Sequence, residues 1–368
     1  MGDNLDFALP TNISELSSAY LTAALRRGGQ LSNGEVSSVD ASPLGAGVGF
    51  VGQLARLELG YEGDRGGLPY TMIAKFPIED PMAKYLARIY GFYRTEAECY
   101  CQASTVGLGV PTPAVYFSEV SDDDTGTLIL MEDLSDARMA DQVAGADLAD
   151  AQAVMDVGAQ LHAAWWESDR LAELTWLRPL NNPAYMAVGE QYAASWPIFA
   201  EMFASAPAAA LEVGERIAAQ LPTSYDWLMA NRPTTLVHTD FRLDNFFFDR
   251  PGAPVTVIDW QLTVRSVGAF DVGYFIVQSL TTEMRREHGE RLLRRWHQGL
   301  IDRGVSNYSW DEALADFHDS VMLQMSIPVI AAANLDPANE RGKHLLDCLG
   351  HRSCQALADY GCSELRIG

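Results

Sequence analysis

The sequence predicts an α+β protein of two lobes: an N-terminal lobe built on an antiparallel sheet with one key helix, and a larger, mainly helical C-terminal lobe. A chain of 368 residues is long enough to bury two separate cores. Short segments in which apolar and polar residues alternate, typical of strands, are concentrated in the first third of the chain. Longer segments with apolar residues at helical spacing dominate after it. We therefore expect a strand-rich N-terminal lobe and a larger, helical C-terminal lobe.

In the N-terminal lobe, the first helix is expected to run from a cap at Asn12 to Arg27. Glu15 stands in the capping-box position, and Gly28 can end the helix. A second helix is expected over residues 82–104, where apolar residues recur at helical spacing. Alternating patterns predict strands over residues 36–41, 53–59, 70–76, 115–120 and 127–131.

In the C-terminal lobe, apolar spacing predicts a helix over residues 147–167 and another that begins near Pro207. Pro222 is expected to interrupt the second of these helices, because proline lacks the backbone N–H that a helix interior needs. A strand at 235–237 leads into a polar loop. Three amphipathic helices are expected after it, over residues 283–303, 311–332 and 339–359.

Charge and cysteine content narrow the class of protein. The formal net charge is −23, which disfavours nucleic acid and anionic membranes as partners; a cationic substrate and plain solubility both remain open explanations. No apolar run approaches the ~18 residues that a membrane span needs. The N-terminal segment carries Asp3 and Asp6 and lacks the basic region of a signal peptide, so we expect no signal peptide. The five cysteines show no Cys-x-x-Cys spacing, so we expect neither disulfides nor zinc, and a cytoplasmic protein.

The most informative stretch runs from His238 to Asp259. Asp240 stands five residues before Asn245, and three phenylalanines after Asn245 predict the first strand of a hairpin. The returning strand ends at Asp259 and should bring it beside Asn245. ATP-dependent phosphoryl transfer needs such a set, with one carboxylate to accept a hydroxyl proton and two hard oxygen ligands for Mg²⁺.

This pattern, His-x-Asp-x-x-x-x-Asn followed by Ile-Asp-Trp, resembles the aminoglycoside phosphotransferase and choline kinase superfamily, whose members are small-molecule kinases with a protein-kinase-like fold. Gln261 and the segment 161–166 resemble the ecdysteroid-kinase-like branch and its bacterial members in particular. The resemblance is clear over residues 44–274. It implies a bilobal protein-kinase-like fold, with a nucleotide-binding lobe at 1–134 and a catalytic and acceptor-binding lobe at 135–368.

The resemblance also implies a reaction in which ATP and an alcohol give ADP and a phosphate ester. Asp240 would take the proton of the acceptor hydroxyl, while Asn245 and Asp259 would hold Mg²⁺. Arg242 would neutralise the migrating phosphoryl group, and His238 would brace the loop rather than exchange protons. Only eleven residues separate Asp259 from Asp271, too few for the activation loop of a protein kinase, so a protein substrate is not expected.

A glycine-rich segment precedes the strand at 53–59. Gly47, Gly49 and Gly52 fit the spacing Gly-x-Gly-x-x-Gly, which alone is weak evidence for any one ligand. A dinucleotide-binding loop should open a helix, whereas a strand follows here, so we expect a hairpin over the phosphates of ATP. A plain glycine-rich turn remains the alternative.

Lys75 lies within an apolar strand in a chain with only three lysines. The resemblance assigns it to the α- and β-phosphates of ATP; the alternative is a strand-end lysine that reaches out to water. Glu96 borders the apolar face of the following helix, while Glu98 lies just over half a turn away. We therefore expect Glu96 to pair with Lys75. The segment from Glu132 to Leu134 is expected to link the lobes and to face adenine with its backbone.

The acceptor is harder to specify. An aromatic-rich region could pack as helix core or form a wall for a flat substrate; it comprises Trp165, Trp166, Trp176, Tyr185, Tyr192, Trp196 and Phe199. Together with the acidic charge, it leads us to expect a neutral or cationic hydroxylated small molecule with an apolar, steroid-like body. An aminoglycoside acceptor and a non-catalytic nucleotide-binding module are the alternatives. The sequence does not specify the oligomeric state.

Overall fold

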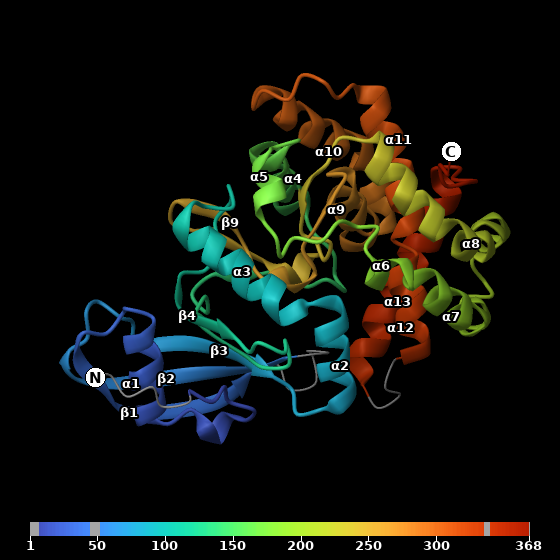
Figure 1. Ribbon diagram of the computed structural model, residues 1–368. Helices are drawn as coiled ribbons and strands as arrows, with labels where there is room; N and C mark the ends of the chain where they lie inside the picture. Colours follow the sequence, from blue (N-terminus) through green and yellow to red (C-terminus); the bar gives the residue numbers. More distant parts are fainter. Residues whose placement is uncertain (1–6, 45–51, 335–338, 368) are drawn as a thin grey trace. The chain divides into compact units, whose positions relative to one another are not determined.

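The computed structural model describes residues 7–44, 52–334 and 339–367 (Figure 1). The chain forms two compact units. The N-terminal unit comprises residues 1–108 and 112–137, and the C-terminal unit comprises residues 109–111 and 138–368. The N-terminal unit contains an antiparallel sheet and the C-terminal unit is mainly helical, so the predicted α+β class is confirmed.

The N-terminal unit is organised on a five-stranded antiparallel sheet with the strand order β1-β2-β3-β5-β4. Its strands are β1 (Asn33–Leu44), β2 (Gly52–Asp64), β3 (Thr71–Pro77), β4 (Val115–Val120) and β5 (Thr127–Glu132). Met72, Ala74 and Phe76 alternate along β3 and are buried in one core with helix α1 (Ser18–Arg27). Because side chains alternate along a strand, Lys75 points to the opposite face of the sheet.

The first helix starts later than its sequence pattern suggests. Asn12 caps only a short 3₁₀ turn, η1 (Ile13–Glu15), and accepts a hydrogen bond from Ser14 N. Ser17 caps α1 instead, through a hydrogen bond from Tyr20 N. The prediction of one helix capped at Asn12 was therefore wrong, because two capping residues five positions apart each begin their own turn.

The second predicted helix, over residues 82–104, is also two helices. Helix α2 (Pro81–Tyr90) ends at Gly91, and α3 (Phe92–Thr105) begins there. Gly91 has φ +72°, a left-handed conformation that ends a helix and that glycine adopts without steric cost. Apolar spacing continues on both sides of the break, which is why periodicity alone did not reveal it.

The C-terminal unit is mainly helical and contains a few short strands. Its strands are β6 (Arg138–Met139), β7 (Thr235–Val237), β8 (Phe246–Arg250), β9 (Ala253–Val257) and β10 (Val264–Ser266). Its helices are α4 (Leu148–Trp165), α5 (Arg170–Glu173), α6 (Pro183–Met186), α7 (Val188–Met202), α8 (Ala208–Asn231), α9 (Ala269–Tyr274), α10 (Thr282–Asp302), α11 (Trp310–Leu323), α12 (Ser326–Asn334) and α13 (Glu340–Asp359). Short 3₁₀ turns, η2 (Leu243–Asn245) and η3 (Trp260–Leu262), and a π-helical turn, η4 (Phe275–Ser279), complete it.

Two helices in this unit differ from expectation at a proline. Pro222 lies inside α8, which continues through it, so the predicted interruption was wrong. Helix α8 buries residues along its whole length, and Gly189 of α7 lies directly against the ring; tertiary packing therefore outweighs the ~3 kcal/mol cost of an interior proline. In contrast, the helix expected over 311–332 is divided into α11 and α12. Pro328 lies in the first turn of α12, where its missing N–H costs nothing.

Within the described ranges, no helix is both long enough and apolar enough to cross a lipid bilayer.

Candidate active site

The polar loop between β7 and β8 is placed by a hairpin, as its sequence predicts. Strand β7 pairs with β10, and β8 pairs with β9 with Phe246 opposite Val257. One residue further on, Ile258 N donates to Asn245 O at 3.1 Å. This bond brings the backbone of Asp259 next to that of Asn245, so the expected return of the second acidic residue is confirmed.

Asp240 lies at the centre of a set of polar contacts. Asn245 Nδ2 donates both to the Asp240 backbone oxygen at 2.8 Å and to Asp240 Oδ2 at 2.9 Å. Arg242 Nε lies 3.4 Å from the same Oδ2 atom. The other carboxylate oxygen, Oδ1, accepts a hydrogen bond from the hydroxyl of Tyr274 at 3.0 Å. The carboxylate is therefore held in one orientation by residues of the loop and of α9.

The residues proposed to hold Mg²⁺ have chemistry that fits it. Both hydrogen bonds of the Asn245 amide use Nδ2, and no residue in the described ranges donates to its Oδ1, so a hard amide oxygen remains for a cation. Asp259 adopts φ +64°, an unusual conformation for a residue other than glycine. Nowhere in those ranges do three His, Cys, Asp or Glu side chains gather around one point.

Arg242 lies among carboxylates. Besides Asp240, its guanidinium lies 3.7 Å from Asp244 through Nη1 and Oδ2. The negative charge of Asp240 raises the pKa of Arg242 above its usual value, against the opposing effect of burial, and Tyr274, Asp244 and Asp259 add to the increase. The side chain therefore carries a permanent positive charge next to the proposed base.

Asp271 fixes the backbone at the start of the loop. Its Oδ2 accepts from His238 N and its Oδ1 from Thr239 N, both at 2.8 Å. The His238 ring is 2.8 Å from Ile258 O through Nε2, so this nitrogen donates to a carbonyl and ties the loop to the end of the hairpin. A bracing role for His238 is consistent with this contact.

His162, on α4, is a fully buried and fully bonded histidine. Trp296 Nε1 donates to its Nδ1 at 3.0 Å, so the proton of the neutral ring is on Nε2, 3.1 Å from Asp271 Oδ2. These contacts pair both ring nitrogens, so His162 is a buried helix residue with its polar atoms satisfied.

Thr239 has φ +62°, a left-handed conformation that a β-branched residue adopts at a cost. Two bonds hold it there: its N–H donates to Asp271, and its hydroxyl donates to Leu262 O at 2.7 Å. Strain of this kind persists where the surroundings determine the backbone, and here it turns the chain immediately before Asp240.

In the N-terminal unit, Lys75 and Glu96 form the expected ion pair. Lys75 Nζ lies 2.7 Å from Glu96 Oε2 and 2.8 Å from Oε1, and both side chains are largely buried. Glu98 is partly exposed on the same helix. A side chain on Gly52 would contact the Lys75 side chain, so this glycine lies beside the pair. Gly47 and Gly49 lie outside the described residues.

The segment expected to face adenine follows β5. The backbone N–H of Glu132 donates to Ala114 O at 2.8 Å, and the Oε2 atom of Glu132 accepts from Ala114 N at 3.1 Å. Leu134 is buried, and Asp133 lies 2.8 Å from Arg56 of β2. These contacts fix the segment within the N-terminal unit; its role towards a nucleotide stays a prediction.

The aromatic-rich region is mostly core. Trp165, Tyr192 and Phe199 are fully buried, and Tyr192 stacks on Trp196, with its hydroxyl bonded to Gly214 O at 2.8 Å. A Cβ on Gly214 would lie only 2.2 Å from the Trp196 ring, which shows how tightly α7 packs on α8. For the buried rings, the structure supports helix packing and not a wall for a substrate.

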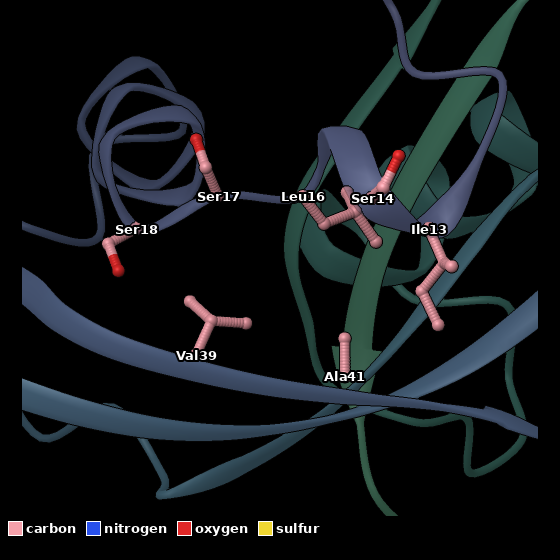
Figure 2. Close-up of a pocket in the computed structure, with 7 residues that line it drawn as sticks. All are labelled: Ile13, Ser14, Leu16, Ser17, Ser18, Val39 and Ala41. Carbon is pink, nitrogen blue, oxygen red and sulfur yellow. The ribbon is translucent and has the colours of Figure 1, made fainter.

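One hollow lies at the surface of the N-terminal unit, between the η1–α1 segment and β1 (Figure 2). It carries no charged side chain and none of the residues predicted to be functional, so it is no candidate for the active site. Its lining consists of Ile13, Ser14, Leu16, Ser17, Ser18, Val39 and Ala41.

Two site residues were missed in the sequence. Tyr274 stands three positions after Asp271, so helical spacing alone could have placed it on the same face, towards the loop. The side-chain oxygen of Gln142 accepts a hydrogen bond from Leu243 N at 2.8 Å. The backbone N–H of Gln142 donates to Asp244 Oδ1 at 3.3 Å. No local pattern links Gln142 to a loop about 100 residues later in the chain.

A model of the ecdysteroid kinase-like family matches residues 46–305, which is more than half of the chain. The chain belongs to the ecdysteroid kinase-like family. The match confirms the resemblance to the ecdysteroid-kinase-like branch that the sequence shows. No curated protein matches this ecdysteroid kinase-like sequence significantly.

Solved structures share the fold of this ecdysteroid kinase-like protein at low sequence identity. An ethanolamine kinase from Plasmodium vivax is 10% identical, with 93% of this chain and 89% of that chain covered and a TM-score of 0.54. A choline kinase from Cryptosporidium parvum Iowa II is 9% identical, with 88% and 91% covered and a TM-score of 0.50. A protein of Ralstonia eutropha JMP134, provisionally assigned as an aminoglycoside phosphotransferase, is 18% identical, with 94% and 98% covered and a TM-score of 0.50. At these identities the likeness establishes the protein-kinase-like fold alone.

Proposed function

We propose that this protein transfers the γ-phosphoryl group of ATP to a hydroxyl group of a small molecule. The observation that carries the proposal is the Asp240 carboxylate, held by Asn245 on one oxygen and by Tyr274 on the other, beside a returning hairpin that ends in Asp259. Phosphoryl transfer requires little covalent chemistry from a protein; it requires a positioned base, metal ligands and fixed positive charge. The loop provides groups for each of these roles.

In this proposal Asp240 accepts the proton of the acceptor hydroxyl while the oxygen attacks the γ-phosphorus. Arg242, with its permanent charge, faces the transferring group and stabilises the negative charge on it. Asn245 Oδ1 and the Asp259 carboxylate would hold Mg²⁺, which when bound neutralises phosphate charge. Lys75 would bind the α- and β-phosphates, and Glu96 would fix its position.

For the acceptor, we propose a neutral or cationic hydroxylated compound. The net charge of −23 disfavours anionic acceptors such as sugar phosphates. Membership in a family described as ecdysteroid kinase-like favours an alcohol with an apolar, steroid-like body. The burial of Trp165, Tyr192 and Phe199 removes these rings from the argument for an apolar acceptor. An aminoglycoside is the second candidate, which the acidic charge equally favours.

The test is acceptor-dependent release of ADP from Mg-ATP, measured with a panel of sterols, polycyclic alcohols, amino alcohols and aminoglycosides. Wild-type protein should release ADP with at least one class, and D240N should not. Binding of Mg-ATP without ADP release above the D240N level, for every class, would overturn the proposal in favour of a non-catalytic nucleotide-binding module.

A further inference from the structure

The 3₁₀ turn η2 ends in Asn245, the proposed amide ligand of Mg²⁺, and starts after Arg242. The first N–H groups of a helical turn have no partner inside the turn, and a Ser, Thr, Asp or Asn in the cap position usually accepts from them. The guanidinium of Arg242 has donors only, and in the described part of the chain this side chain makes no capping hydrogen bond. The turn therefore needs an acceptor from another part of the chain.

Gln142 provides that acceptor. Its side-chain oxygen, Oε1, accepts from Leu243 N, the first N–H of the turn, at 2.8 Å, and its backbone N–H donates to Asp244 Oδ1 at 3.3 Å. Two consecutive residues of η2 are thus bonded to one residue outside the loop. The Ser279 hydroxyl lies 3.2 Å from the same Leu243 N, which is a longer contact. Gln142 is therefore the main cap of the turn.

Gln142 is itself fixed in place. The residue is fully buried, its Nε2 donates to Gln278 O at 2.9 Å, and its backbone oxygen accepts from Arg352 Nη1 of α13 at 2.8 Å. The Ser279 hydroxyl donates to its Oε1 at 3.1 Å. Each polar group of Gln142 is bonded, so its amide oxygen has one orientation, and a fully bonded buried network of this kind is rigid.

This external cap separates two tasks that one residue could not perform. A serine or aspartate at position 242 could cap η2, but it could not place a positive charge beside Asp240. Arg242 does so, with Nε 3.4 Å from Asp240 Oδ2. Because Gln142 fixes the start of the turn, an arginine can stand in the cap position and face the site.

We infer that Gln142 is a positioning residue for the proposed Mg²⁺ site: as the external cap of η2, it fixes where Asn245 presents its side-chain oxygen. The inference rests on the proposed function and assigns to it a residue outside the loop. Asn245 N donates to Arg242 O at 2.9 Å and closes the turn, so Asn245 moves when the start of the turn moves. Loss of a group that orients a metal ligand typically lowers metal affinity by about 10- to 100-fold.

The experiment measures binding of the non-hydrolysable ATP analogue AMP-PNP to the whole chain, with saturating Mg²⁺ and again with EDTA. The ratio of the two dissociation constants is the gain in affinity that the metal contributes. An effect of a variant on the nucleotide site alone changes both constants and cancels in the ratio. The ratio should fall about tenfold in Gln142→Met.

Methionine suits this test because it has about the length of glutamine and lacks the amide. The groups that lose Gln142 keep other partners: Gln278 O still accepts from Arg352, and Leu243 N still faces the Ser279 hydroxyl. Gln324→Met is the matched control. Gln324 is also fully buried and also donates from Nε2 to a backbone carbonyl, Phe270 O, at 3.1 Å, and among the described residues it makes no hydrogen bond to the loop. Equal falls in Q142M and Q324M would make Gln142 only structural and would overturn the inference, as would an unchanged ratio in Q142M.

Gln142→Glu tests whether the cap itself matters. A glutamate side chain keeps an oxygen towards Leu243 N and, when protonated, an O–H towards Gln278 O. The ratio in Q142E should therefore stay within about twofold of the wild type. A tenfold fall in Q142E would show that the oxygen towards Leu243 is not the group that matters, and would reject the inference.

Two measurements remain if Q142M does not fold. Ser279→Ala removes the longer of the two contacts to Leu243 N and should leave the ratio within about twofold of the wild type. A tenfold fall in S279A would assign the cap to Ser279 and overturn the inference. In the wild type, hydrogen exchange at Leu243 N should be much slower than in an unfolded chain, and exchange at the unfolded rate would also overturn it.

None of these measurements needs an acceptor, so the inference and the proposed function can fail separately. A wild type in which Mg²⁺ strengthens AMP-PNP binding, with the expected loss in Q142M, supports the inference even if it never releases ADP; that result would reject the proposed function. A wild type in which Mg²⁺ does not strengthen AMP-PNP binding would overturn the inference, whatever the ADP assay shows.

Discussion

The ammonium group of Lys75 lies 2.7 Å from the Glu96 carboxylate, and this pair joins strand β3 to helix α3. Lys75 is mostly and Glu96 almost completely shielded from water, so the attraction between them is screened little by salt. The ion pair restricts the flexible Lys75 side chain to one orientation.

We predict that Lys75→Ala raises the KM for ATP and lowers kcat, and that Glu96→Ala does the same more mildly. Since the two side chains act as one unit, the double variant should be close to K75A alone, and the double-mutant cycle should show coupling of about 1 kcal/mol or more. Steady-state kinetics with varied ATP measure this. Glu98→Ala is the control on the same helix; a larger effect of E98A than of E96A would contradict the assignment.

For Asp240→Asn we expect loss of turnover with Mg-ATP binding retained. Asparagine has nearly the same shape but cannot accept the proton, so kcat should fall about 10²-fold or more. Calorimetric titration with Mg-ATP measures the binding that should survive. Near-normal kcat in D240N would remove Asp240 from its proposed role.

Asp271→Asn should destabilise the protein. The carboxylate accepts hydrogen bonds from the backbone of His238 and Thr239 on its two oxygens, whereas an amide has one acceptor oxygen. A buried N–H would then face an NH₂ group, which costs on the order of 3 kcal/mol. Urea unfolding gives the free energy. Asp156→Asn is the control, since its ion pair with Arg295 is half exposed and should contribute about 1 kcal/mol or less.

Glu312 should make stability depend on pH in the acidic range. Hydrogen bonds from the backbone and side chain of Ser309, at the start of α11, lower the pKa of Glu312 from 4.5 to about 2. A lowered folded-state pKa gives stability that is fully present above the unfolded value and is lost as pH falls towards 2. Glu312→Gln keeps the capping box but carries no charge, so its stability should change less than the wild type's between pH 5 and 2. Parallel slopes for the two proteins would refute this.

The acceptor class can be separated by ionic strength. A polycationic aminoglycoside would bind through several ion pairs, so its KM should rise steeply from low to high salt. An apolar alcohol should show little change. The comparison requires ADP release at a minimum of three salt concentrations with ATP saturating. A steep salt dependence with an aminoglycoside, and no turnover with any apolar alcohol, would replace the apolar acceptor with the aminoglycoside.

Local patterns predicted much of this fold. Alternating side chains located the strands around Lys75, and the spacing from Asp240 to Asn245 and Asp259 identified the loop and its hairpin. These features depend on neighbours within a few residues, where chain geometry alone determines which side chains meet.

The failures have a different origin. The residues on both sides of Gly91 keep the apolar spacing of a helix, yet Gly91 adopts the left-handed backbone conformation and divides α2 from α3. Pro222 remains inside α8 because contacts with α7, distant in sequence, compensate for the lost hydrogen bond. Gln142 reaches the loop from about a hundred residues away. For Pro222 and Gln142, tertiary contacts, which periodicity does not record, determined the outcome.

The contact between Gly214 and Trp196 restricts how these two positions can diverge among related proteins. The indole ring occupies the space in which any other residue at 214 would place its Cβ, 2.2 Å away. A relative with alanine or a larger residue there must have a smaller side chain at 196, or a wider separation of the two helices. Homologous sequences should therefore show correlated substitutions at these positions: a bulky ring at one with glycine at the other, or compact residues at both.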